Sequence, residues 1–150
     1  MNIGLYARVL RNKAALECLQ SIIGYLSKNE IGIFFHEELH KNLDESKLGI
    51  DTAYEVFSTE DILESQIDYL LCIGGDGTLH GAHEIYKEIE KRGLNIAIAG
   101  IPKTIDNDIC LMDKTFGFET AYTMASPIIK DAHNEATGAY NGIVVIKLMG

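Results

Sequence analysis

Short apolar runs alternate with longer amphipathic segments along most of the chain. The runs that read as strands are residues 2–7, 31–35, 69–73, 95–99 and 142–148. This alternation is typical of parallel strands that are joined by crossover helices. It predicts an α/β fold with a three-layer, doubly wound, five-stranded parallel sheet of order 2-1-3-4-5, which is flavodoxin-like or Rossmann-like. Ligands of such sheets bind where the strand order reverses, beyond the carboxyl ends of the first and third strands.

Two segments have apolar residues at the three- and four-residue spacing of an amphipathic helix. The first lies between the first two strands, with Asn12 as its cap and Lys28 near its end. The second begins near Leu79, after the third strand, and ends with Arg92 and Gly93. A cation and a glycine at that end suit a helix C-terminus, so we expect both helices to form.

The remaining segments are less regular. Residues 39–59 are polar and weakly periodic. We interpret them as a loop with a helical turn, and a short strand around residues 54–57 is the alternative. Ser58 and Asp61 resemble a capping pair that opens a brief helix to about residue 66. Residues 120–136 have helical spacing around Pro127, which removes a backbone donor. This proline either kinks one helix or starts a second one.

Composition narrows the class of protein. The chain has 150 residues and a net charge of −9, which favours one globular domain over residues 1–150 and gives no basic stripe for nucleic acid. No apolar run approaches the ~18 residues of a membrane span. The three cysteines, Cys18, Cys72 and Cys110, lie in apolar stretches, which predicts buried thiols in a cytoplasmic protein.

A glycine-rich turn follows the third expected strand and precedes a helix. It consists of Gly74, Gly75, Asp76, Gly77 and Thr78. Backbone amides in such a turn can bind phosphate, and Asp76 could hold Mg²⁺ or take a proton from an attacking hydroxyl. Equally, the glycines could serve only a tight turn, with Asp76 or Thr78 capping the helix.

The stretch from Asp68 to Leu79 resembles a signature shared by NAD kinases, diacylglycerol kinases and 6-phosphofructokinases. This resemblance favours the phosphate-binding interpretation of Gly74–Thr78. The likeness to NAD kinases implies that Asp76 activates the attacking ribose hydroxyl. The likeness to phosphofructokinases implies instead that Asp76 holds the Mg²⁺ of the phosphoryl donor.

Residues 102–108 read Pro-Lys-Thr-Ile-Asp-Asn-Asp, and they resemble the sugar-site loop of one phosphofructokinase subgroup. From the residues alone, Asp106 and Asp108 could act as base and orienter, or they could stabilise a turn. The resemblance implies that Asp106 is the general base on the sugar hydroxyl, with Thr104 and Asp108 beside it. It places Lys103 near the transferred phosphoryl group.

The phosphofructokinase resemblance continues to Met149 and Gly150, the start of a Met-Gly-Arg motif that binds the sugar phosphate. Gly77 follows the pattern of the enzymes that use ATP, whereas Lys103 also occurs in enzymes that use pyrophosphate. The implied donor is therefore Mg²⁺ with ATP, and pyrophosphate is the alternative.

Residues 1–73 resemble a different relative. The first strand leads into Arg8 rather than into a glycine-rich nucleotide loop, and this half is similar to the start of a bacterial NAD kinase. We therefore hypothesise a recombined or engineered chimera whose seam lies at residues 74–79. A single natural kinase that matches both halves equally well would remove this hypothesis.

Both families complete their active sites with a second domain or with neighbouring subunits, which we expect to be absent here. The expected function is weak binding of Mg-nucleotide or phosphate without kinase activity. One alternative is an active phosphotransferase fragment that acts on a sugar phosphate or on NAD. Another is a designed scaffold without a ligand. A flavodoxin-like carrier and a phospho-receiver are disfavoured, because the residues after the first and third strands do not suit them.

Two further patterns carry smaller expectations. Residues 36–40 fit the His-Glu-x-x-His pattern of zinc proteases, but His36 directly follows a strand, so a surface turn is expected. Residues 142–148 would form an apolar edge strand, which leaves homodimerisation open.

Overall fold

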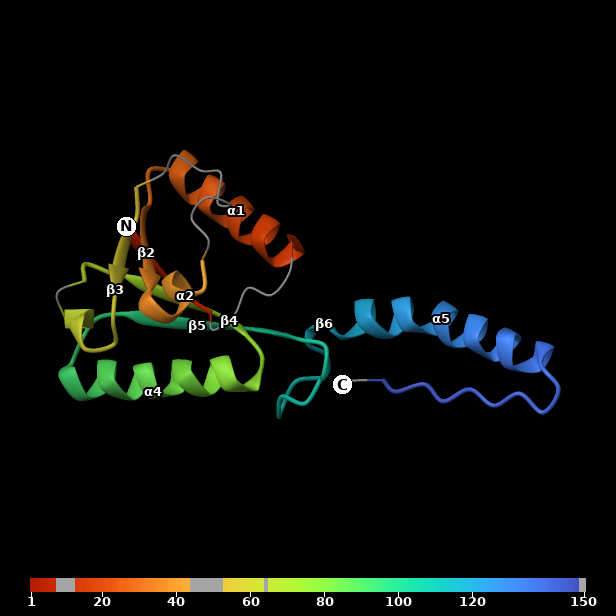
Figure 1. Ribbon diagram of the computed structural model, residues 1–150. Helices are drawn as coiled ribbons and strands as arrows, with labels where there is room; N and C mark the ends of the chain where they lie inside the picture. The colour runs from red at the N-terminus through yellow and green to blue at the C-terminus, as the bar shows by residue number, and fades with distance from the viewer. Residues whose placement is uncertain (8–12, 44–52, 64, 149–150) are drawn as a thin grey trace. The chain divides into compact units, whose positions relative to one another are not determined.

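In the computed structural model, the described residues are 1–7, 13–43, 53–63 and 65–148 (Figure 1). The chain divides into two compact units, Met1–Ile101 and Pro102–Gly150. The first unit contains most of the sheet, and the second contains the end of its fifth strand with one further strand and a long helix. The expectation of a single domain over the whole chain stays a prediction.

The strands follow the order β3-β2-β1-β4-β5-β6. Their bounds are β1 Asn2–Tyr6, β2 Gly32–His36, β3 Glu55–Phe57, β4 Tyr69–Gly74, β5 Ala97–Thr104 and β6 Phe116–Gly117. The pairs β1–β2, β1–β4, β2–β3 and β5–β6 are parallel. The sequence predicted that the first strand lies between the second and the third. This is confirmed, because β1 lies between β2 and β4.

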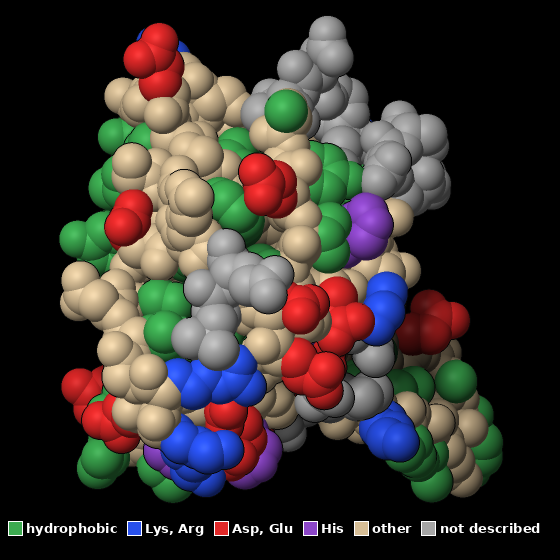
Figure 2. Space-filling model, turned by 90° about the vertical axis from the view of Figure 1, so that its left-hand side faces the viewer, with side chains coloured by type: hydrophobic (Ala, Val, Ile, Leu, Met, Phe, Trp, Pro, Cys, Tyr) green, Lys and Arg blue, Asp and Glu red, His purple; other side chains and the backbone are tan. Residues whose placement is uncertain are grey.

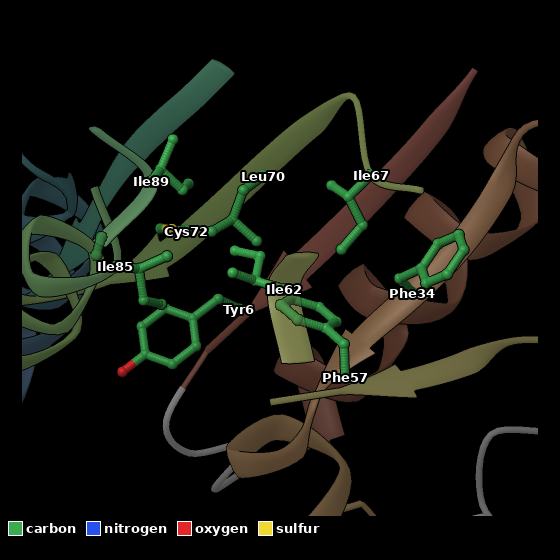
Figure 3. Close-up of a cluster of buried hydrophobic side chains, with 10 residues drawn as sticks. Tyr6, Phe34, Phe57, Ile62, Ile67, Leu70, Cys72, Ile85 and Ile89 are labelled. Atoms are coloured by element: carbon green, nitrogen blue, oxygen red, sulfur yellow. The ribbon is translucent and has the colours of Figure 1, made fainter. Parts of the chain in front are cut away.

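Helices cover both faces of the sheet in the first unit. They are α1 Lys13–Lys28, α2 Glu37–Lys41 and α4 Asp76–Arg92, with a 3₁₀ turn η1 at Asp61–Leu63. Leu5 and Phe35 pack with α1, whereas Tyr6 and Phe34 belong to the cluster that includes residues of α4 (Figure 3). Because successive strand residues point to opposite faces, both faces are apolar, and the predicted three layers are confirmed for this unit.

The two predicted amphipathic helices are present as α1 and α4. The C-terminus of α4 is closed by Gly93, whose φ of 65° is left-handed and whose N–H bonds to the carbonyls of Ile89 and Glu90. Such a conformation favours glycine, so the predicted end of this helix at Gly93 is confirmed. Asn12, the predicted cap of α1, lies outside the described residues.

The predicted capping pair is also confirmed. The Ser58 hydroxyl donates to Asp61 Oδ2 at 2.8 Å, and the Asp61 N–H donates to Ser58 Oγ at 3.1 Å. The element that follows is only the short η1. The short strand that the sequence left open around residues 54–57 is present as β3, which lies beside β2 and buries Phe57, so the loop was the wrong alternative there.

The second unit corrects two expectations. Its helix α5, Phe118–Gly138, continues through Pro127, so no second helix begins there. Residues 142–148 do not form a strand, and the predicted fifth strand is wrong. Instead β6 pairs with the end of β5, Lys103 opposite Phe116 and Thr104 opposite Gly117. Dimerisation through residues 142–148 stays a prediction.

The cysteines differ from one another in environment. Cys72 is buried in β4, but Cys18 and Cys110 are exposed, which corrects the expectation of three buried thiols. Cys18 lies on the outer face of α1, where an apolar neighbourhood in sequence does not imply burial. Among the described residues, no helix combines the length and the apolar character that crossing a bilayer requires.

Candidate functional site

The glycine turn connects β4 to α4. Gly74 ends β4, Gly75 is the N-cap of α4 in an extended conformation, and no side chain caps this end of the helix. The alternative in which Asp76 or Thr78 caps α4 is therefore wrong. The first N–H groups of a helix have no partner within the helix, and together with the helix dipole they attract anions. This end of α4 has the chemistry of a phosphate site.

Close packing shapes the same turn. A Cβ on Gly74 would lie 2.3 Å from Thr78 Oγ1 and 2.5 Å from Thr78 Cβ. Thr78 is buried, so it has little room to move away. Gly74 is needed here because strand and helix approach closely, in addition to any role in binding.

Asp76 is the first residue of α4, and it is exposed. Among the described residues, no group of three or more His, Cys, Asp or Glu side chains is arranged to hold a metal ion. A single carboxylate nevertheless fits Mg²⁺, which is commonly bound by one or two carboxylates together with substrate phosphates and water. Asp76 could therefore contribute one ligand to a Mg²⁺ ion that a bound phosphate also coordinates.

Residues 105–115, which we call the acidic loop, belong to the second unit and connect β5 to β6. Thr104 Oγ1 lies 3.2 Å from Asp106 Oδ2, and the Asp106 N–H donates to the same hydroxyl oxygen at 3.2 Å. Asp106 and Asp108 are both exposed, and so is Lys103 at the end of β5. The structure thus brings Thr104 and Asp106 into direct contact and leaves both carboxylates accessible.

A hollow of about 450 Å³ adjoins Asp106 within the second unit. The first turns of α5 contribute aromatic and small side chains to its wall; the lining includes Ile105, Asp106, Phe118, Tyr122, Ser126 and Ile129. Asp106 is its charged member. A carboxylate at the rim of a mostly apolar hollow is accessible to a reacting hydroxyl without being fully surrounded by water.

Asn107 and Thr115 hold this loop together, a role that sequence reasoning missed. The Thr115 N–H donates to Asn107 Oδ1 at 2.8 Å, and Thr115 Oγ1 donates to the Thr104 carbonyl at 2.8 Å. Asn107 Nδ2 donates to the Asp113 carbonyl at 3.3 Å. The one available signal was an asparagine between two aspartates, since asparagine tolerates left-handed backbone and bonds to nearby backbone groups.

A second hollow, of about 440 Å³, lies in the first unit beside α4. Its lining is rich in acid: Glu38, Glu60, Glu84 and Glu88, with Arg92. Figure 2 shows one face of the molecule, on which the Lys and Arg side chains of the described residues lie among acidic ones and form no continuous basic stripe. Negative charge makes this hollow unsuited to phosphate, so the N-terminus of α4 is the better phosphate site in this unit.

His36 lies at the same hollow and not in a surface turn, because it is only 4% exposed. It caps α2: its Nδ1 accepts from the Glu38 N–H at 3.2 Å, while Nε2 lies 3.1 Å from Thr59 Oγ1. Its ring packs edge-on against Tyr6 and Phe57. Burial lowers the pKa of His36, although the negative charges of Glu38 and Glu37 oppose this effect.

The predicted site residues therefore fall into two groups. The first unit carries residues 74–78, and the second unit carries Lys103, Thr104, Asp106 and Asp108. Met149 and Gly150, the predicted sugar-phosphate residues, lie outside the described residues.

Comparison with known proteins shows that both groups of residues lie within one family match. The sequence model for "Phosphofructokinase" matches residues 36–150. The chain belongs to the phosphofructokinase family. It is 44% identical over 133 residues to ATP-dependent 6-phosphofructokinase 4, chloroplastic, of Arabidopsis thaliana, a match that covers 85% of this chain and 24% of that protein. It is 54% identical over 84 residues to the ATP-dependent 6-phosphofructokinase of Borreliella burgdorferi, covering 56% of this chain and 19% of the relative. The chain thus spans about a quarter or less of these two phosphofructokinases.

These matches give no support to the chimera hypothesis. The family match begins at residue 36, well before the expected seam at residues 74–79. The 133-residue match to the Arabidopsis phosphofructokinase is longer than the part of the chain that follows the seam, so one natural enzyme matches on both sides of it. The relatives found are phosphofructokinases, and none of them is an NAD kinase.

Proposed function

We propose that this phosphofructokinase domain binds Mg-ATP at the glycine turn, and that its acidic loop supplies a general base for phosphoryl transfer to a sugar phosphate. The uncapped N-terminus of α4 behind Gly74 and Gly75 carries the proposal, because it provides backbone donors for phosphate. The relatives are ATP-dependent 6-phosphofructokinases, which supports ATP as donor and fructose 6-phosphate as acceptor. Pyrophosphate remains the competing donor.

At the donor end, the N–H groups at the start of α4 bind the phosphate oxygens, and the helix dipole favours their negative charge. Gly74 and Gly75 let the backbone approach without side chains between it and the ligand. Asp76 would hold Mg²⁺, which neutralises charge on the transferring phosphoryl group when it is bound.

At the acceptor end, Asp106 takes the proton from the attacking hydroxyl as general base. The Thr104 hydroxyl bonds to one oxygen of this carboxylate, which limits its rotation and leaves the other oxygen for the substrate. Lys103 supplies positive charge near the transferred group, and Asp108 lies two residues beyond the base. Met149 and Gly150 would contact the phosphate of the sugar.

Isothermal titration calorimetry with Mg-ATP tests the donor site. We expect binding by the wild-type chain and a loss of at least tenfold in affinity for Asp76→Asn, because the metal loses its carboxylate. Asp131→Asn is the matched control, since Asp131 is an exposed aspartate on α5. No heat at millimolar Mg-ATP would refute the donor site and favour a scaffold without a ligand. Equal affinity of Asp76→Asn and wild type would refute the role of Asp76 in holding the metal.

A coupled assay with fructose 6-phosphate tests transfer separately from binding. Asp106→Asn keeps an oxygen that can accept from Thr104 but cannot take the proton, so turnover should fall roughly 10²–10⁴-fold. Mg-ATP affinity should not change in this variant. Binding without turnover by the wild type is the outcome expected from the sequence, and it would reduce the function to nucleotide binding. Replacing ATP with pyrophosphate in the same assay identifies the donor.

A further inference from the structure

One buried polar residue closes the loop that carries Asp106. Thr115 is 5% exposed, and it is the one fully buried side chain among the described residues of the second unit. Its amide and its hydroxyl bond to residues eight and eleven positions earlier, Asn107 and Thr104. We call the pair Asn107 and Thr115, with these hydrogen bonds, the loop clasp. The fold protects this polar residue from water while leaving the larger apolar side chains around it exposed.

The clasp acts on the general base through Thr104. The carbonyl of Thr104 accepts from the Thr115 hydroxyl, and the hydroxyl of Thr104 pairs with both the carboxylate and the N–H of Asp106. Thr104 is therefore held on its backbone side by Thr115, while its side chain holds Asp106. Loss of the Thr115 hydroxyl would release both Thr104 and the carboxylate that it orients.

Asn107 fixes the backbone between the two acids. Its φ of 52° lies in the left-handed region, where asparagine and glycine are favoured. Its side chain accepts from Thr115 and donates to the Asp113 carbonyl, so both polar atoms of the amide are used within the loop. Asp106 and Asp108 flank this fixed residue and are both exposed. The asparagine thereby sets the direction of the chain on either side of itself.

We propose that Asn107 and Thr115 are positioning residues for Asp106 in the phosphoryl transfer. This proposal rests on the proposed function, in which Asp106 is the base. A general base must lie within hydrogen-bond reach of the proton that it takes, and a displacement of about 1 Å can cost about 10²-fold in rate. The clasp supplies this precision in a unit whose described part has no other buried side chain.

Kinetics of three variants test the proposal. Asn107→Gly keeps the left-handed backbone but removes both side-chain bonds, and Thr115→Val replaces the hydroxyl with a methyl group of similar shape. In the coupled assay we expect kcat to fall about 10²-fold in both, with KM for Mg-ATP within twofold of wild type. Thr115→Ser keeps the hydroxyl and should retain at least a third of wild-type kcat. Unchanged kcat in Asn107→Gly and Thr115→Val, or a loss in Thr115→Ser equal to that in Thr115→Val, would overturn the positioning role.

Amide hydrogen exchange gives a second measurement that does not need turnover. The amides of Thr115 and Asp106 should exchange at least tenfold faster in Asn107→Gly and Thr115→Val than in wild type, and at the wild-type rate in Thr115→Ser. Unchanged exchange in the first two variants would show that the clasp does not hold the loop. A wild-type chain without turnover refutes the proposed transfer, whereas the exchange rates still decide whether the clasp orders Asp106.

Discussion

The glycine turn offers a sharp test of the structure at Gly74. Alanine at this position would place its Cβ 2.3, 2.5 and 3.0 Å from Oγ1, Cβ and Cγ2 of Thr78. Distances under about 3 Å between a Cβ and other side-chain atoms are severe overlaps. Thr78 is 7% exposed and belongs to the first turn of α4, so relief requires a shift of the helix start against β4.

The expected loss follows from two opposing effects. Forcing extra volume into a packed site costs roughly 1–3 kcal/mol. Replacing glycine with alanine restricts the unfolded chain and returns roughly 0.4–1 kcal/mol. The net expectation for Gly74→Ala is a loss of roughly 0.5–2 kcal/mol in unfolding free energy, which for a chain of this size lowers Tm by about 2–4 °C for each kcal/mol.

Urea unfolding followed by circular dichroism measures this difference, and two variants make it specific. Gly24→Ala is the matched control on α1: its Cβ would meet nothing within 4 Å, so it should stabilise by roughly 0.5–1 kcal/mol. Thr78→Gly removes the clashing atoms, so the double variant with Gly74→Ala should lose less stability than the sum of the two single changes. A Gly74→Ala protein as stable as Gly24→Ala, or a double variant that is additive, would refute the close packing of strand and helix.

Two further predictions concern buried titratable groups. Burial lowers the pKa of His36 in the folded protein below the ordinary histidine value of about 6.5, so the unfolded chain binds more protons as the pH falls below that value. From about pH 7.5 to about 5.5, unfolding free energy should therefore fall more steeply in wild type than in His36→Asn, which retains a cap acceptor; parallel slopes would contradict this. Burial also raises the pKa of Cys72 to about 12. A disulfide reagent should therefore modify the exposed Cys18 and Cys110 quickly, and Cys72 only at the rate of unfolding.

The sequence predicted the central strands and both long helices of the first unit because their side chains report burial directly. Strands β1, β2 and β4 are apolar on both faces, and α4 ends at a glycine whose left-handed φ its residue type already suggested. Strands β3 and β6 have three and two residues, which is too short for any periodicity to be visible. Both strands pair with a neighbour, β3 with β2 and β6 with β5, and β3 also buries the side chain of Phe57.

The errors share a physical cause, since an apolar run shows that a segment could be buried but not that a partner is present. Residues 142–148 have the composition of a strand and yet form none. The reverse holds for His36, for which a surface turn was predicted because it directly follows a strand. Its burial comes from rings and hydrogen-bond partners on other elements, Tyr6, Phe57 and Thr59, and no local pattern can reveal these.

The acidic loop shows why chemistry and folding could not be separated at the level of sequence. Residues 102–108 allowed two interpretations, a catalytic pair of carboxylates or a turn that bonds its own backbone. Both descriptions apply, but to different residues: Asn107 makes the turn, and Asp106 stays exposed beside it. The bonds that decide this assignment reach Thr115, which lies outside the motif. A loop that must present a carboxylate at a defined position needs a neighbour that uses its own polar atoms on the backbone, and the asparagine between the two aspartates meets that need.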